Sequence, residues 1–223
     1  MRIILITFML LAVQLQARLH VFGDSHCKMF KGIRHARIHY KVAVTMHRVG
    51  RDKNSILKTH QCKISPNDTV ILIFGEIDVR CHVKKIAQRF GISPTEVIDN
   101  LANRYFNAID ECFGKYNLKN MIICEIMPPS IHPKLKYFDE VPEGDVTKLG
   151  YPAIGTFDER LEYRRLLNTA MEARCAKRNY KFFKYDHLIT NEKGALIPEL
   201  SDANVHLAQK HHYLIHRELR KIL

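Results

Sequence analysis

Short apolar runs alternate along the chain with longer stretches of helical period. The apolar runs cover residues 19–22, 40–44, 69–74 ("TVILIF"), 121–126 ("MIICEI") and 180–185. Turn-forming residues bound each run, and the runs are nearly continuous in hydrophobicity rather than alternating. This is typical of parallel strands that are covered on both faces. The pattern predicts a sheet of about five parallel strands.

The helical stretches carry recognisable N-terminal signals. In "SPTEVIDNLANRYFNAIDECF", Ser93 is a favourable N-cap, Pro94 suits the first helical position and Glu96 completes a capping box. A second helix is expected from Thr156 to about Lys177, again with a glutamate three residues after the cap. A third is expected in the closing segment that begins at Leu207. Alternating strands and helices predict an α/β fold, a three-layer α/β/α sandwich in a single domain.

One segment departs from this rhythm. Residues 127–155 contain five of the eight prolines and three of the ten glycines. An irregular connection of this length in a compact domain is usually functional, and it leaves the carboxyl end of the fourth predicted strand, where open α/β sheets bind ligands. We therefore expect it to cover an active site, with a passive surface insertion as the alternative.

The first 17 residues, "MRIILITFMLLAVQLQA", differ from the rest. An arginine at position 2, an unbroken apolar stretch from Ile3 to Val13 and a small residue at Ala17 are typical of a secretory signal peptide. We expect residues 1–17 to be the signal, residues 18–223 to form the domain, and the protein to be exported. The alternatives are an uncleaved anchor in contact with a membrane, or a buried first strand in a cytoplasmic protein.

Charge and cysteine content limit the partners. The chain of 223 residues has a formal net charge of +12, and ten Lys or Arg residues lie between Lys28 and Lys63 against one acid, Asp52. This favours an anionic partner, with a solubilising basic face as the alternative and nucleic acid as an unlikely partner for an exported chain. The six cysteines form no C-x-x-C pair, so we expect no metal and no cofactor.

The candidate chemistry begins in "HVFGDSHC", where Ser25 follows the first predicted strand after Gly23 and Asp24. A serine hydroxyl is a poor nucleophile unless an imidazole accepts its proton and a carboxylate orients that imidazole. "LSDANVHLAQ" supplies Asp202 and His206 before the last predicted helix. A helix N-terminus would disfavour the imidazolium and the carboxylate would favour it, so the imidazole would remain a base near neutral pH. The alternative is that Ser25 is only a turn residue.

The blocks "FGDS", "GEID" and the late Asp-His pair resemble the SGNH (GDSL-type) hydrolases over essentially the whole chain after residue 17. The resemblance implies a flavodoxin-like sandwich and an esterase, lipase, carbohydrate deacylase or acyltransferase. It implies Ser25 as nucleophile and oxyanion donor, Gly50 as a second backbone donor, and Asp202 and His206 as the remaining triad members.

Two departures from the family pattern matter. In the usual G-x-N-D block an asparagine side chain is the third oxyanion donor, but "GEID" has Ile77 at that position, and Gly75 and Asp78 alone match. Loss of one such donor typically costs about a hundredfold to a thousandfold in rate. The second departure is three residues, rather than two, between Asp202 and His206.

The residues around "GEID" offer substitutes for the missing donor. Arg80 is the expected replacement, because a guanidinium can hold a developing oxyanion or a substrate carboxylate, and His82 is the alternative. Asp24, Gly75, Glu76 and Asp78 are expected beside the site. The sequence therefore predicts a serine esterase acting on an O-acyl ester, with an acylated carbohydrate or glycan as substrate. An acyltransferase with the same triad, or a weakened module that binds anionic glycans, is the alternative.

Overall fold

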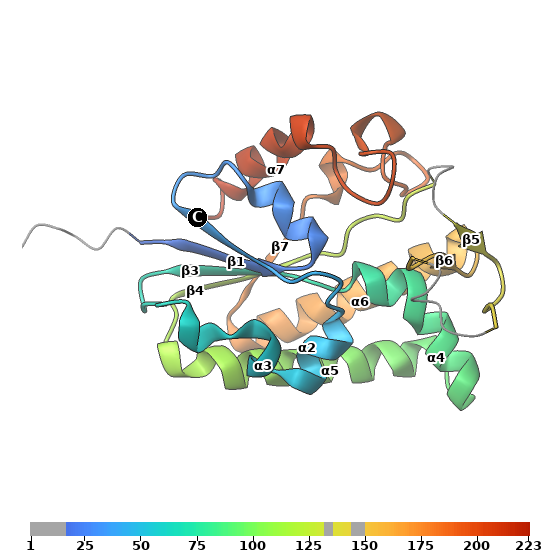
Figure 1. Cartoon of the computed structure of the whole chain (residues 1–223), viewed down its shortest axis with the longest axis horizontal. Helices are drawn as coiled ribbons and strands as arrows, with labels where there is room; N and C mark the ends of the chain where they lie inside the picture. The colour runs from blue at the N-terminus through green and yellow to red at the C-terminus, as the bar shows by residue number, and fades with distance from the viewer. Residues whose placement is uncertain (1–16, 132–135, 144–149) are drawn as a thin grey trace, which may run out of the picture.

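The computed structural model describes residues 17–131, 136–143 and 150–223. Five parallel strands form one sheet in the order β2-β1-β3-β4-β7 (Figure 1). The strands span Leu19–Gly23 (β1), Ala36–Tyr40 (β2), Thr69–Ile73 (β3), Asn120–Cys124 (β4) and Lys181–Phe183 (β7). The predicted fold, a five-stranded parallel sheet between helical layers, is confirmed.

The second strand was predicted wrongly at residues 40–44. It ends at Tyr40 and pairs in register with β1 from Leu19↔Ala36 to Gly23↔Tyr40. This strand lies at the edge of the sheet and is partly exposed, so it alternates polar and apolar residues instead of forming an apolar run. The apolar residues after it belong to the loop that leads into the next helix, where Val42 is 70% exposed.

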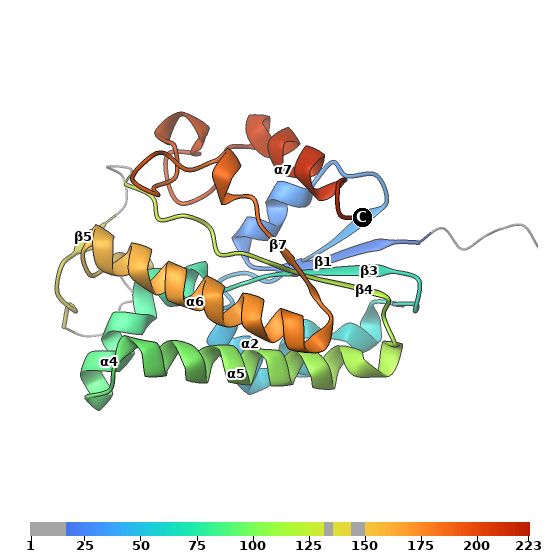
Figure 2. The same cartoon turned by 180° about the vertical axis from the view of Figure 1, so that it is seen from behind.

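Side chains of the central strands alternate between two separate cores. Phe22, Val70 and Leu72 face a cluster formed with the helices α2 (Met46–Asp52), α5 (Pro94–Phe113) and α6 (Phe157–Arg178). Val21 and Ile71 face a cluster formed with the residues after β1 and with the helix α7 (His212–Leu219). Figure 2 shows α5 and α6 lying across one face of the sheet, with α7 on the other. The carboxyl ends of the strands all open at one edge.

The helices span Met46–Asp52 (α2), Asn54–Leu57 (α3), Val83–Phe90 (α4), Pro94–Phe113 (α5), Phe157–Arg178 (α6) and His212–Leu219 (α7). The helices α5 and α6 begin within one residue of the predicted positions, whereas α7 begins at His212 and not at the predicted Leu207. Ser93 accepts the N–H of Glu96 at the start of α5, and Thr156 and Glu159 form a complete capping box on α6. Two shorter turns carry the functional sequence blocks, a 3-10 turn at Ser25–Phe30 (η1) and a π-turn at Asp78–His82 (η3).

Other expectations are covered only in part by the described residues. Residues 1–16 of the predicted signal lie outside them, as do residues 132–135 and 144–149 of the proline-rich segment. The described part of that segment includes a short parallel pair, Tyr137–Phe138 (β5) with Ala153–Ile154 (β6). All six cysteines are buried free thiols. No helix within the described ranges is long and apolar enough to cross a membrane.

Candidate active site

Ser25 is placed by a sharp turn where β1 leaves the sheet. A Cβ added at Gly23 would lie 2.5 Å from Ile73 Cγ2 and 2.7 Å from Cys27 Cβ, so only glycine fits between β3 and the turn that follows. Asp24 caps this turn, because its Oδ1 accepts the backbone N–H of His26 at 2.9 Å. The sequence Gly-Asp-Ser thus provides close packing, a cap and a hydroxyl at the open edge of the sheet.

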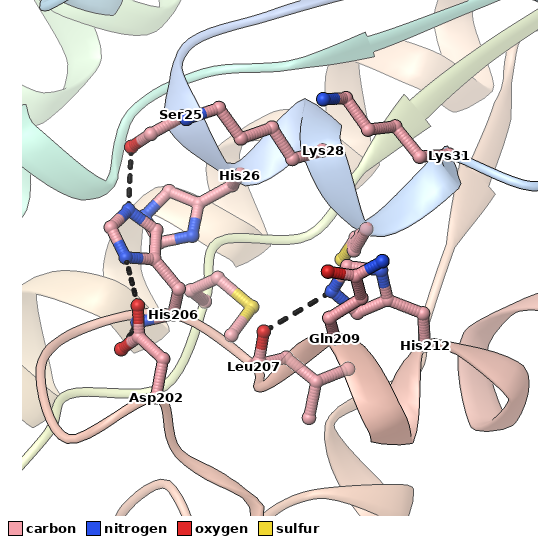
Figure 3. A pocket seen from close by; sticks show the side chains of 11 residues that line it. Ser25, His26, Lys28, Lys31, Asp202, His206, Leu207, Gln209 and His212 are labelled. Carbon is pink, nitrogen blue, oxygen red and sulfur yellow. Dashed lines mark hydrogen bonds and ion pairs between the residues drawn. The ribbon is translucent and has the colours of Figure 1, made fainter.

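His206 and Asp202 meet Ser25 from the other end of the chain. The Nε2 atom of His206 lies 2.7 Å from Ser25 Oγ, and its Nδ1 atom lies 2.9 Å from Asp202 Oδ2 (Figure 3). With the Nδ1 proton donated to the carboxylate, Nε2 is free to accept the proton of the serine hydroxyl. The structure therefore brings together the three residues that the sequence analysis proposed as a triad.

Asp202 and His206 lie in a tight loop that contains three residues between them, one more than in the family pattern. Its ends are tied by a bridge between Ser201 and Leu207, and Asp202 N–H donates to His206 O at 2.9 Å. Within this loop Ala203 adopts a left-handed backbone conformation with φ 69°. Asp202 Oδ1 accepts two backbone N–H groups of the loop, which leaves Oδ2 aimed at the imidazole.

The pKa of His206 is lowered from its ordinary value. Burial is the largest cause, the nearby His26 acts in the same direction, and Asp202 opposes both. The predicted contribution of a helix N-terminus is wrong, because α7 begins only at His212 and dipole effects are confined to the first turn. A neighbouring histidine takes the role that the sequence analysis assigned to the helix.

His26 directly follows Ser25, but no role was predicted for it from the sequence. Its ring is buried, and its centroid lies 4.8 Å from that of His206. Its Nε2 lies 3.5 Å from Glu76 Oε2, an ion-pair contact without hydrogen-bond geometry. The only sequence signal for this residue was its position beside the candidate nucleophile.

Arg80 is paired with Glu76 rather than free to face the substrate. Its Nε and Nη2 donate to the two Glu76 carboxylate oxygens at 2.6 and 3.1 Å, and both side chains are largely buried. Glu76 keeps a pKa below its ordinary range, because Arg80 and His26 outweigh the opposing effect of burial. The predicted oxyanion role of Arg80 is therefore not supported by its contacts, which make it the partner of Glu76.

Gly50 has contacts that do not support its predicted role as the second oxyanion donor. It sits inside α2, where an added Cβ would lie 3.0 Å from Arg104 Cβ on α5. The loop that leaves β2 beside Ser25 is instead residues 41–45, since Lys41 N–H donates to Gly23 O at 2.8 Å. The N–H of Ser25 itself has no acceptor among the described residues and remains an available oxyanion donor.

The other residues predicted beside the site have mainly structural contacts. Asp78 caps α2 by accepting the N–H groups of Met46 and His47 at 2.7 and 3.1 Å, and burial raises its pKa to about 7. Gly75 has φ 117°, and an added Cβ would lie 2.6 Å from Ile126 Cδ1. His82 lines a separate groove with Asp78, on the side of α4 and α5.

A cavity of about 310 Å³ opens beside Ser25 and His206. Its other walls include Met127 at the start of the proline-rich segment, together with Lys28, Lys31 and His212. Among the described lining residues, Asp202 is the only carboxylate, and it is already engaged by His206. The space next to the candidate nucleophile therefore has a basic wall. Within the described ranges, no three His, Cys, Asp or Glu side chains converge as metal ligands.

Comparison with known proteins supports the fold. No family model and no curated protein matches the sequence. Among solved structures, a proposed acylhydrolase from Bacteroides fragilis has a TM-score of 0.64 at 10% identity over 94% of this chain and 87% of its own. A GDSL-like lipase from Bacteroides thetaiotaomicron has a TM-score of 0.58 at 15% identity, covering 95% and 91%.

A third similar structure is a catalytic mutant of Axe2, an acetylxylan esterase from Geobacillus stearothermophilus. It has a TM-score of 0.55 at 11% identity and covers 92% of this chain and 93% of its own. At such low identity these similarities establish a shared fold.

Proposed function

We propose that this protein is a serine esterase-type hydrolase that acts on an O-acyl ester. The observation that carries the proposal is the line of contacts from Ser25 Oγ through both nitrogens of His206 to Asp202. In this mechanism His206 removes the hydroxyl proton as Ser25 Oγ attacks the acyl carbon, and then returns that proton to the leaving alcohol. Water releases the acyl group from Ser25 in the second half of the reaction.

Two features support an ester over other substrates. Ser25 stands at the open edge of the sheet beside a cavity large enough for a small acyl group and part of an alcohol. The neighbours in fold include lipases and acylhydrolases, and in the acetylxylan esterase substitutions of a serine, a histidine and an aspartate are described as catalytic mutants. An acylated carbohydrate or glycan fits this combination.

The basic wall of the cavity favours an anionic substrate. Lys28 and Lys31 both line the space next to Ser25, and the one carboxylate in the described part of the lining, Asp202, is engaged by His206. A uronate, sulfate or phosphate on the substrate would gain from these charges, mainly where the cavity excludes water. Lys31→Ala should raise KM for a negatively charged ester and leave a neutral ester unchanged. Lys210→Ala, an exposed lysine outside the lining, is the matched control.

The test of the main proposal is a screen of the purified chain lacking residues 1–17. Short-chain nitrophenyl esters and acetylated sugars would be measured beside Ser25→Ala, and a fluorophosphonate probe would be mapped by mass spectrometry. We expect turnover and labelling at Ser25 in the wild type and neither in Ser25→Ala. Ester turnover that survives in Ser25→Ala, or labelling at another serine, would contradict the proposal.

The same experiments address the alternatives. An acyltransferase would consume the ester faster when a sugar acceptor is added and would yield the acylated sugar. A glycan-binding module would give no turnover and no labelling, but would bind sulfated or uronate-containing glycans with an affinity that falls steeply as salt rises.

Export through residues 1–17 is a further part of the proposal. Expression of the full chain in a secreting host, followed by N-terminal sequencing, would test it. We expect a mature chain that begins at Arg18. An intact Met1 in a chain retained inside the cell would contradict export.

A further inference from the structure

The ring of His26 packs against the candidate base, His206. The two ring centroids lie 4.8 Å apart with 46° between their planes. The side chain of His206 is 29% exposed, and its solvent-facing side does not restrict the ring to one orientation. The buried His26 ring provides a wall on one side, while Ser25 and Asp202 hold the two nitrogens (Figure 3).

A row of buried charges runs away from His26 into the protein. Glu76 Oε2 lies 3.5 Å from His26 Nε2, and the same carboxylate receives two hydrogen bonds from Arg80. On the other side, Asp24 Oδ1 accepts the backbone N–H of His26. Asp24 is 1% exposed, His26 4% and Glu76 7%, so water does little to screen these groups.

The balance of charge in this row depends on His26. Burial raises the pKa of Asp24 to about 6, so above that pH two carboxylates, Asp24 and Glu76, face one permanent cation, Arg80, and a buried uncompensated charge is costly. An imidazolium at His26 makes the row neutral. In agreement, the pKa of His26 is raised, because Asp24 and Glu76 together outweigh the effect of burial, which lowers it.

We infer that His26 is a positioning residue for His206. The carboxylates of Asp24 and of Glu76, which Arg80 holds in place, favour the imidazolium of His26; its buried ring fixes the place of the base, and its positive charge disfavours protonation of that base. The inference rests on the proposed function, because a base is required only if Ser25 attacks an ester. It also gives the residues of "GEID" and Arg80 a function in this chain that differs from oxyanion binding.

Other charged groups around His206 do not replace this effect. Asp202 contacts its Nδ1 and favours the imidazolium, and Glu76 acts in the same direction from farther away. Lys28, Lys31 and His212 line the adjoining cavity. Of the groups that lower the pKa of His206, His26 is the largest after burial itself.

The test follows the titration of His206 directly by NMR of protein labelled at histidine, with the signal assigned by its loss in His206→Gln. We compare the wild type with two variants. His26→Gln removes the cation, whereas Glu76→Gln removes one of the two carboxylates that favour it, so the pKa of His26 should fall. His26→Gln should move the titration of His206 to higher pH. Glu76→Gln should give a smaller shift, because the removed carboxylate also favours the imidazolium of His206 itself. His216→Gln is the matched control, because His216 packs on the same turn through Met29 O without lining the cavity.

The pH profile of kcat/KM gives the second readout. In His26→Gln the ratio of activity at pH 6 to activity at pH 8 should fall by about threefold or more, since more of the base is protonated at pH 6, and in Glu76→Gln the fall should be smaller. A purely structural role would lower activity equally at both pH values. An unchanged titration of His206 in both folded variants, or an equal change in His216→Gln, would overturn the inference.

The NMR arm separates this inference from the proposed function. If the wild type neither hydrolyses esters nor reacts with the fluorophosphonate, but His206 still shifts in both variants, then the coupling holds and the proposed function fails. If esters are hydrolysed through Ser25 and His206 titrates identically in all proteins, the proposed function holds and the role of His26 is refuted.

Discussion

His206 Nε2 lies 2.7 Å from Ser25 Oγ, although 181 positions separate the two residues in the chain. Ser25 is held by the turn after β1, at the first strand of the fold, whereas His206 comes from a loop before the last helix. The parallel sheet makes this meeting possible, because the carboxyl ends of its strands share one edge. The geometry leads to predictions about function and stability.

Asp202→Asn should lower kcat by about a thousandfold, less than the roughly 10⁴-fold loss known for a buried triad aspartate. The side chain of Asp202 is 38% exposed, so water can assume part of its role. Residues that act as one unit are not additive, and Ser25→Ala combined with Asp202→Asn should therefore be no slower than Ser25→Ala alone. Single-turnover kinetics on an activated ester would measure both. A double variant much slower than Ser25→Ala would show that Asp202 acts outside the triad.

Arg80→Ala should reduce the free energy of unfolding by about 3–5 kcal/mol, because it leaves the buried Glu76 carboxylate without its partner. Arg80→Ala combined with Glu76→Gln should cost clearly less, since no lone charge remains in that pair. Urea denaturation of the two single variants and the double variant gives the coupling between the residues.

The kinetic result decides between this structural pairing and an oxyanion role for Arg80. An Arg80→Ala protein that keeps its stability but loses kcat about a hundredfold on neutral esters would restore the oxyanion role. Arg80→Lys serves as the intermediate variant, because it keeps the charge and loses the planar fork.

Ala203→Gly should raise the free energy of unfolding by about 0.5–1 kcal/mol, because glycine adopts φ 69° without the Cβ penalty. Ala208→Gly, in the same region but with φ −63° and ψ 142°, should be neutral or destabilising. Thermal and urea unfolding would compare the two. Equal effects of the two substitutions would mean that the left-handed turn stores no strain.

Acid should destabilise the protein in part through His39. Its pKa is lowered to about 4, first by burial and then by the neighbouring His20, whose Nδ1 lies 3.0 Å from His39 Nε2. In the unfolded chain His39 becomes protonated near pH 6.5, whereas in the folded protein it becomes protonated only near pH 4. The contribution of His39 to stability is therefore present above pH 6.5 and is lost as the pH falls towards 4.

The measurement compares wild type and His39→Gln by urea denaturation at a series of pH values. The variant should lose less stability between pH 6.5 and pH 4, while the other titrating groups cancel in the comparison. His60→Gln, at an exposed histidine outside the His20–His39 pair, is the matched control and should follow the wild type. Parallel curves for wild type and His39→Gln would contradict the prediction.

The sequence by itself determined the central strands, the two longest helices and three candidate site residues, Ser25, Asp202 and His206, which the structure brings into contact. Central strands buried on both faces must be apolar, and helix caps such as Ser93 and Thr156 are local, so each leaves a signal in a few consecutive residues. Ser25 could be identified because it follows the first predicted strand. Asp202 and His206 could be identified because they precede the last predicted helix.

Only the tertiary structure decided the partners of the remaining site residues. Gly50 was predicted to be an oxyanion donor from the family resemblance, and its packing inside α2 against Arg104 is a tertiary contact that leaves no signal in the sequence. Arg80 could have faced substrate, Asp78 or Glu76, and the π-turn that follows β3 directs it to Glu76. His26 acquires its place beside His206 only when two ends of the chain meet, because contacts over such separations depend on packing rather than on local pattern.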